Sequence, residues 1–341
     1  MSVSDLLTRQ FAHTRATATD IIENVAGINA QTARAPVVGL RARNPAIGVT
    51  EVGHHLSQYS WVKANLMRGT VHLVTARQYL AWRQALQPAL SRTVRQFLPR
   101  LRDAVSDHDL LAEAMPVLEA HPCLTRKELG LRLNSRIPHV DPADLGFAAR
   151  LLCPLVQEAP RSAWSEPSRV RLILASHVLD GELSSAEGGL QDLSRSYARA
   201  FGPDATFADF TYWSGLTGVK TSLMRIGFPF SAEPPDATAP LVVITPEYDN
   251  IFFCSKTRYP DLTDAKKRLI FSPSAGMYGA VLWANHVVAN WRRKPGTEDV
   301  AVDFWEPPTD AVRKAVKEFE VWYARQAESP SDQMMREKLS D

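Results

Sequence analysis

The positions of hydrophobic and polar residues predict two helices joined by a tight turn in the second third of the chain. Apolar residues recur at helical spacing over Asp107–Ala120, and His121-Pro122 ends that pattern. Thr125 and Glu128 follow with the spacing of a capping box, in which a hydroxyl and a carboxylate bind free N–H groups at a helix start.

A third helix and a hairpin are predicted after these two helices. The helix is expected over Leu145–Glu158, and the extended runs are Ala163–Trp164 and Val170–Leu174. Three helices followed by a hairpin is the order of a winged helix. The pattern therefore predicts a winged-helix unit over residues 104–182.

The same order recurs on both sides of this unit. After it, Thr206 begins a helix and Lys220–Ile226 has the position of a recognition helix, which predicts the helical part of another unit over 183–236. Residues 1–103 predict a further unit, with three helices and one hairpin at Ala18–Val25, Thr32–Arg43, Glu51–Gln58 and Trp61–Thr75.

From about Ala239 the hydrophobic period becomes that of strands. Extended runs are expected at Leu241–Thr245, Ile251–Cys254, Val281–Trp283 and Val287–Trp291, and a last helix at Asp310–Gln326. We therefore expect an α+β protein in which three tandem winged-helix units precede a small β-barrel, or alternatively a curled sheet, with a C-terminal helix over 237–327. Residues 328–341 are expected to form a flexible tail.

Composition excludes several classes of protein. No apolar run approaches the roughly 20 residues that cross a bilayer, and no secretory signal opens the chain, so we expect no membrane contact and a cytoplasmic location. The three cysteines, Cys123, Cys153 and Cys254, lie far apart with no ligand spacing. Neither a disulfide framework nor a metal site is expected.

Charge is distributed unevenly along the chain. Between Val25 and Arg102 there are eleven basic residues and one acid, Glu51, so this stretch carries +10 while the whole chain carries +2. Clustered cations bind polyanions by releasing counterions from phosphates, which predicts a nucleic-acid-binding surface here. The alternative is that each arginine simply coats a solvated helix face.

Six segments carry a resemblance to a known family. They are Gly27–Gln31, Pro36–Arg43, Leu66–Val74, Ala208–Leu216, Pro246–Asn250 and Val287–Arg293. Together they resemble the winged-helix DNA glycosylase family that includes the azinomycin-resistance enzyme, over roughly residues 5–325. The resemblance implies a C-shaped array of three winged helices closed by a β-barrel, with DNA held in the concave face.

The resemblance also implies a catalytic motif. Glycosylases of this family place a Gln, an aliphatic residue and a second Gln at the active site, and the matching positions here are Asn29, Ala30 and Gln31. Asn keeps the carboxamide but is one methylene shorter. The structural alternative is that Asn29 is a turn residue after Gly27 and that Gln31 faces solvent.

Two amides without a carboxylate suit a cationic substrate. An N7-alkylated guanine is positively charged and leaves as a neutral base, so no general acid is required and a positioned water completes the reaction. We therefore expect a monofunctional DNA glycosylase that releases bulky N7-alkylguanine adducts, without metal or cofactor. Its expected role is self-resistance to a genotoxic natural product, acting as a monomer on double-stranded DNA that carries alkylated purines.

Eight residues are candidate DNA contacts. Four lie in the first unit and four at strand-turn positions near the C-terminus: Arg43, Lys63, Arg68, His72, Lys256, Arg258, Arg292 and Arg293. For His72 the alternative is a core histidine, and for the turn residues a solvated turn. Asp249 is interpreted as a turn cap.

A regulator that binds DNA without catalysis remains the rival interpretation. Recognition helices alone would explain a basic surface. Against it stand the β-barrel and the number of units, which exceed what a simple repressor requires. Release of a base from damaged DNA would distinguish the two.

Overall fold

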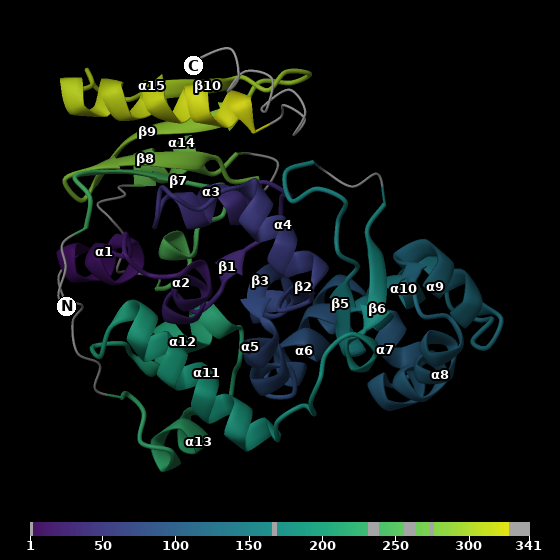
Figure 1. The fold of residues 1–341 in the computed structure, drawn as a ribbon. Coiled ribbons are helices and arrows are strands. Elements are labelled where there is room, and N and C mark those ends of the chain that lie inside the picture. Colours follow the sequence, from purple (N-terminus) through teal and green to yellow (C-terminus); the bar gives the residue numbers. More distant parts are fainter. Residues whose placement is uncertain (1–2, 166–168, 231–238, 256–263, 273–275, 327–341) are drawn as a thin grey trace.

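The computed structural model describes residues 3–165, 169–230, 239–255, 264–272 and 276–326. Lys256, Arg258 and the tail at 328–341 lie outside these residues. Helices and strands are mixed throughout, and three separate sheets divide the strands among them (Figure 1).

The first sheet belongs to the N-terminal third and has the strand order β1-β3-β2. Its strands and the short turn between the last two are β1 (Ile28–Asn29), β2 (Trp61–Asn65), η1 (Met67–Gly69) and β3 (Val71–Thr75). The helices that precede and connect the strands are α1 (Val3–Phe11), α2 (Ala18–Asn24), α3 (Ala35–Arg41) and α4 (Val49–Ser57). The predicted hairpin and helices are present, but β1 had no signal in the hydrophobic pattern.

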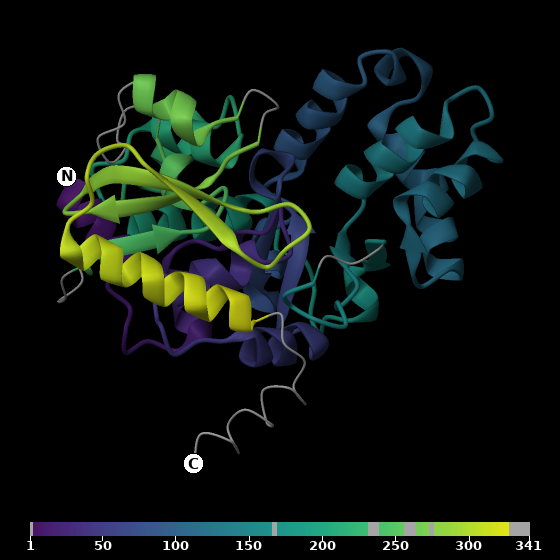
Figure 2. The same cartoon turned by 90° about the horizontal axis from the view of Figure 1, so that it is seen from above.

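The second sheet repeats this order of elements as β4-β6-β5. Its elements are α8 (Asp107–Ala120), β4 (Leu124–Thr125), α9 (Arg126–Asn134), α10 (Pro142–Leu152), β5 (Leu155–Gln157), β6 (Arg171–Leu174) and η2 (Ala175–His177). In each case a helix, a strand, two helices and two strands follow one another. The unit lies at one end of the molecule, away from the C-terminal sheet (Figures 1 and 2).

The remaining helices connect or follow these two groups. Along the chain, the first and second sheets are connected by α5 (Ala76–Trp82), α6 (Gln87–Phe97) and α7 (Leu101–Ala104). The second sheet is followed by α11 (Ala186–Phe201), α12 (Phe207–Ser214) and α13 (Lys220–Arg225). Capping boxes begin α9 at Thr125 and α12 at Thr206, as the sequence predicts. The described part of 183–236 contains helices and no strand.

The third sheet is open, with the order β10-β9-β8-β7. Its elements are β7 (Val242–Thr245), η3 (Asn250–Phe252), α14 (Asp264–Ile270), β8 (Gly279–Trp283), β9 (His286–Arg293), β10 (Val300–Phe304) and α15 (Asp310–Arg325), and α15 lies along this sheet (Figure 2). Its edge strands β7 and β10 do not pair with each other within the described residues. Of the two expected alternatives, the closed β-barrel is therefore wrong.

Three local predictions also fail. Ile251–Cys254 was expected to be a strand, but the Asp249 carboxylate accepts a hydrogen bond from the Ile251 N–H at 3.1 Å and starts the 3-10 turn η3. The helix expected over Leu145–Glu158 ends at Leu152, since Cys153 and Pro154 lead into β5. Because β5 pairs with β6, the expected strand at Ala163–Trp164 is absent.

Three buried clusters form the hydrophobic core. One cluster is confined to α6–α10, β4, β5 and β6, with members from Leu90 to Leu174. The other two join the N-terminal third to distant parts of the chain, reaching Val287 in one case and Tyr323 in the other. The first sheet is therefore held in place by α11, α12, α15 and the C-terminal sheet.

Candidate active site

The residues that match the family's catalytic motif lie at and just beyond β1. Asn29 pairs directly with His72 of β3, and the Ala30 N–H donates to the Val71 carbonyl at 2.8 Å. Gly27 precedes the strand with φ of 80°, and a Cβ there would lie 2.8 Å from Val74 Cγ1. Only glycine fits this close approach, so Gly27 sets where β1 begins. Asn29 thus lies in a strand, and its interpretation as a turn residue is wrong.

Both carboxamides of the motif are oriented by backbone N–H groups. Asn29 is 2% exposed, and its Oδ1 accepts a hydrogen bond from the Gln31 N–H at 3.1 Å. Gln31 is exposed, and its Oε1 accepts from the Val71 N–H at 3.2 Å. Each oxygen has a second lone pair. Gln31 Nε2 makes no hydrogen bond to any residue that the structure describes.

His72 shares the face of the first sheet with Asn29, because directly opposed residues of an antiparallel pair point to the same side. The ring is fully buried. Its Nδ1 lies 3.0 Å from the Thr70 carbonyl, which only accepts, so Nδ1 carries the proton and Nε2 is a bare acceptor. Nε2 is buried without a hydrogen-bond partner among the described residues.

Burial also keeps His72 uncharged. Desolvation, reinforced by the charge of Arg68, lowers the pKa of His72 to about 3. Full burial and the neutral ring favour the core-histidine alternative, and the role of His72 as a DNA contact stays a prediction. His72 lies opposite Asn29 in the neighbouring strand, on the same face of the sheet.

Arg43, another predicted DNA contact, is buried and paired. It is 1% exposed, and its guanidinium forms a bidentate ion pair with Asp249 at 3.0 and 3.1 Å. Further bonds run to the Gly39 carbonyl and to Gln10 Oε1. This buried ion pair connects the residues just after α3 to the segment before η3, and the role of Arg43 as a DNA contact stays a prediction.

Lys63 and Arg68 lie in the hairpin, where Lys63 is buried and Arg68 is partly buried, and their role as DNA contacts stays a prediction. Lys63 is 6% exposed and lies opposite Leu73, on the face of the sheet away from Asn29 and His72. Arg68 has φ of 56°, donates to the Trp213 carbonyl and lies 5.1 Å above the Phe253 ring. Arg68 thus fastens the turn between β2 and β3 to α12.

Arg292 and Arg293 are partly exposed at the end of β9. Arg292 pairs with Asp303 of the neighbouring strand, and Arg293 lies 3.7 Å from Glu298. Glu298 also pairs with Arg34 at 2.9 Å, close to the end of the motif. Their role as phosphate contacts stays a prediction.

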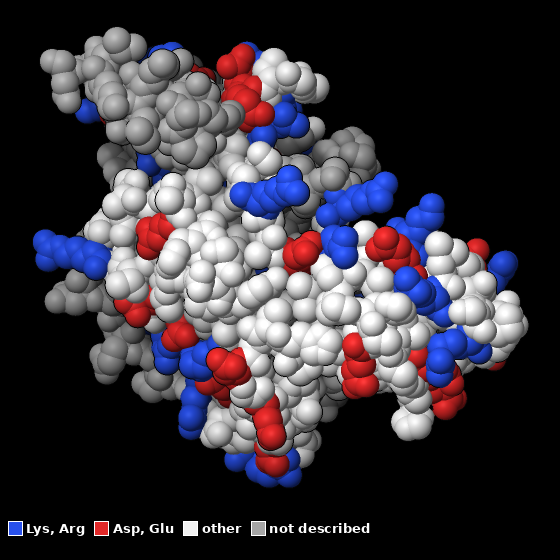
Figure 3. Space-filling view, turned by 45° about the vertical axis from the view of Figure 1, so that its right-hand side comes forward, with Lys and Arg blue, Asp and Glu red and all other residues white. Residues whose placement is uncertain are grey.

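Five of the eleven basic residues between Val25 and Arg102 are paired with acids or buried. Four of them pair with acids from outside this stretch, namely Arg34 with Glu298, Arg43 with Asp249, Arg77 with Glu23 and Asp192, and Arg95 with Asp107. Arg83 is 3% exposed and donates to three backbone carbonyls. Acidic side chains accordingly lie among the basic ones on the face shown in Figure 3.

One carboxylate, that of Glu247, contacts the residue that follows the motif. Thr32, the residue after Gln31, donates to Glu247 Oε2 at 3.3 Å. In the described ranges no three His, Cys, Asp or Glu side chains gather as metal ligands. None of the helices in those ranges is long and apolar enough to cross a bilayer.

Fold and site together define a protein of mixed helices and strands whose candidate active site is a pair of oriented carboxamides on a three-stranded sheet. A family model described as DNA glycosylase AlkZ-like matches residues 22–321, and the chain belongs to that family of DNA glycosylases.

A solved structure has a similar fold. It is the Streptomyces sahachiroi DNA glycosylase AlkZ, with a TM-score of 0.74 and 18% sequence identity, and the match covers 96% of each chain. None of the curated proteins matches the sequence. The resemblance inferred from the six sequence segments is confirmed at the level of the family.

Proposed function

We propose that this glycosylase hydrolyses the N-glycosidic bond of cationic N7-alkylguanine nucleotides in duplex DNA, with a water positioned by Asn29 and Gln31. The observation that carries the proposal is that backbone N–H groups orient both carboxamides, at 3.1 and 3.2 Å. Dipoles that are already oriented stabilise a transition state without reorganising during the reaction.

The proposed reaction needs no proton on the leaving group. The C1′–N9 bond breaks with its electron pair passing to the base, which neutralises the positive charge of the alkylated guanine. The water oxygen then bonds to C1′, and the extra proton is lost to solvent. A second lone pair on Asn29 Oδ1 or Gln31 Oε1 accepts a hydrogen bond from the water and leaves the water's own lone pair aimed at C1′.

DNA binding is assigned in this proposal to winged-helix units. The two groups with helix, strand, two helices and two strands support units over 1–103 and 104–182, and α11–α13 support a third, helical unit over 183–236. The C-terminal sheet and α15 would form the last unit, over 237–327. The proposed biological role is self-resistance to a DNA-alkylating natural product, which predicts that expression protects cells from such a compound.

The test is release of an alkylated base from duplex DNA in single-turnover assays, with and without EDTA. We expect release of N7-alkylguanine and an intact strand with an abasic site. Gln31→Ala should lower the rate by roughly 10²-fold or more, as for loss of one preorganised polar group. Asn29→Ala should have a similar effect, because Asn29 also positions the Gln31 backbone. DNA affinity should be unchanged.

Gln58→Ala is the matched control, since Gln58 is an exposed glutamine at the end of α4. It should release the base as fast as the parent. If neither small nor bulky adducts are released, or if Gln31→Ala is as fast as the parent, the proposal fails and a DNA-binding regulator without catalysis takes its place.

A further inference from the structure

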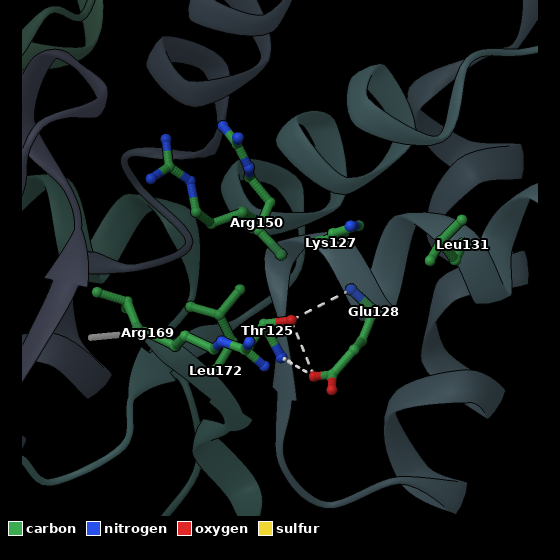
Figure 4. Close-up of a pocket in the computed structure, with 9 residues that line it drawn as sticks. Thr125, Lys127, Glu128, Leu131, Arg150, Arg169 and Leu172 are labelled. Atoms are coloured by element: carbon green, nitrogen blue, oxygen red, sulfur yellow. Dashed lines mark hydrogen bonds between the residues drawn. The ribbon is translucent and has the colours of Figure 1, made fainter. Parts of the chain in front are cut away.

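A basic cavity lies in the second sheet unit, at a distance from the motif along the chain. It occupies about 560 Å³ between the start of α9, the end of α10 and the beginning of β6. Four basic side chains line it, namely Arg126, Lys127, Arg150 and Arg169 (Figure 4). The cations therefore come from three segments that only the fold brings together.

None of these four cations forms an ion pair with a carboxylate among the described residues, although the charge of Arg169 acts on Glu128. Glu128 is the carboxylate that lines the cavity, and its Oε2 accepts from both the Thr125 N–H and the Thr125 hydroxyl at 2.8 Å. Figure 4 shows this carboxylate turned toward Thr125. In the same unit, by contrast, Arg171 pairs with Glu158 at 3.5 Å.

Arg150 brings an unsatisfied donor to the cavity. Its Nε is buried with no hydrogen-bond partner in the described ranges, and the charge of Arg126 acts on its guanidinium. Burial lowers the pKa of Arg150, and the charge of Arg126 lowers it further. An anion placed between the two guanidinium groups would relieve this repulsion and supply the missing acceptor.

The wall of the cavity is apolar. Leu131 and Val170 are 54% and 42% exposed, and the buried Leu172 also lines the cavity. A sugar ring next to a charged group would cover such a wall, whereas an isolated ion would leave it in water. Charge and wall together fit a phosphodiester and its deoxyribose better than a free ion.

We propose that this cavity binds backbone phosphate of the DNA duplex, as an anchor separate from the motif at Asn29 and Gln31. The proposal rests on the proposed function only in that the ligand is DNA. Phosphate contacts position a protein on the duplex without reading sequence. The cavity would thus hold the second sheet unit against the backbone whether or not a damaged base is present.

Undamaged duplex DNA of arbitrary sequence is the probe, and the full chain is used throughout. Affinity is measured by fluorescence anisotropy over a series of salt concentrations for the parent and for Arg126→Gln, Arg169→Gln and the double variant. Both residues are exposed, so the substitutions leave the core intact. Each lost phosphate contact should reduce the salt slope by about 1, and the double variant should reduce it by about 2.

Arg136→Gln is the matched control. It removes the same charge from the same unit, but Arg136 is already paired with Glu113. Its slope should equal that of the parent. A parental slope in the double variant, or an equal reduction in the control, would overturn the proposal.

Free inorganic phosphate is the other ligand that could occupy a basic cavity of this kind. Millimolar inorganic phosphate is therefore tested for its effect on the melting temperature of the parent and the double variant. Stabilisation of the parent alone, with an unchanged DNA slope in the double variant, would assign the cavity to a free anion and overturn the proposal. Because the probe DNA is undamaged, the salt slope can be measured even if the protein releases no damaged base. Conversely, a parental salt slope in the double variant would overturn the proposed cavity but not the proposed base release.

Discussion

The ring of His72 is fully buried next to Asn29, and its hydrogen bond to Thr70 selects the tautomer with a bare Nε2. A histidine in this state is a neutral acceptor at physiological pH. It can support the sheet face that carries the motif but cannot serve as a proton donor there. Burial, and not the identity of the residue, decides its chemistry.

The pKa of about 3 predicts a loss of stability in acid. The unfolded chain protonates His72 below about pH 6.5 while the folded chain does not, so protons favour the unfolded state between pH 6.5 and 3. His72 therefore leaves the free energy of unfolding unchanged above pH 6.5. Below pH 6.5, its protonation in the unfolded chain lowers that free energy by up to about 1.4 kcal/mol per pH unit. Urea denaturation at a series of pH values measures this slope.

His72→Phe is the comparison, because phenylalanine fills a similar volume and does not titrate. Its free energy of unfolding should fall less steeply below pH 6.5 than that of the parent, although it starts lower because the bond to Thr70 is lost. Identical slopes for the two proteins would show that His72 becomes protonated in the folded state.

Two glycines set the contact between α9 and α10. A Cβ on Gly130 would lie 1.9 Å from the Pro142 carbonyl oxygen, and one on Gly146 would lie 2.3 Å from the Arg126 carbonyl oxygen. The two helix backbones therefore touch without side chains between them. Since Arg126 and Arg150 lie on these helices, this contact also sets the shape of the basic cavity.

Gly130→Ala should destabilise the protein by at least about 3 kcal/mol, because the obstructing atoms are backbone and cannot move aside. The change is measured by denaturant unfolding. Gly53→Ala is the control, since a Cβ at Gly53 in α4 meets nothing within 4 Å. There the higher helix propensity of alanine should stabilise by up to about 1 kcal/mol. A neutral Gly130→Ala would mean that the helices separate easily.

At the scale of the whole molecule, the hydrophobic core predicts which parts fold alone. The cluster within residues 90–174 draws on no other segment, while the core of the N-terminal third needs residues of α11, α12 and the C-terminal sheet. The Gln10 carboxamide, for example, donates to the Ala200 carbonyl at 2.9 Å. The first sheet unit is therefore part of a larger body.

A fragment of residues 87–182 should fold cooperatively, whereas residues 1–103 alone should not. The first retains its cluster, although Val156 and Ile173 lose their contacts to the N-terminal third. The second loses most of the residues that bury its apolar side chains. Circular dichroism melts and amide hydrogen exchange of the two fragments are the measurement. Cooperative folding of 1–103 would contradict the shared core.

The sequence by itself determined the elements whose signals are local. The helix at Asp107–Ala120, the capping boxes at Thr125 and Thr206 and the hairpin of β2 and β3 all agree with the pattern. Their hydrogen bonds join residues a few positions apart, so neighbouring residues suffice to predict them. The family also followed from short segments, and its motif led to Asn29 and Gln31, whose catalytic role stays a prediction.

Only the tertiary structure decided what depends on distant partners. The two-residue strand β1 exists because β3 pairs with it, and Arg43 is neutralised by Asp249, 206 positions along the chain. Three other arginines of the basic stretch are also paired with acids from outside it, and the basic cavity draws its residues from three separate segments. Its one local signal was Arg126-Lys127 in the first turn of a helix, where cations are unfavourable. Charge summed along a chain does not report charge in space, because folding places partners by contact and not by position in the sequence.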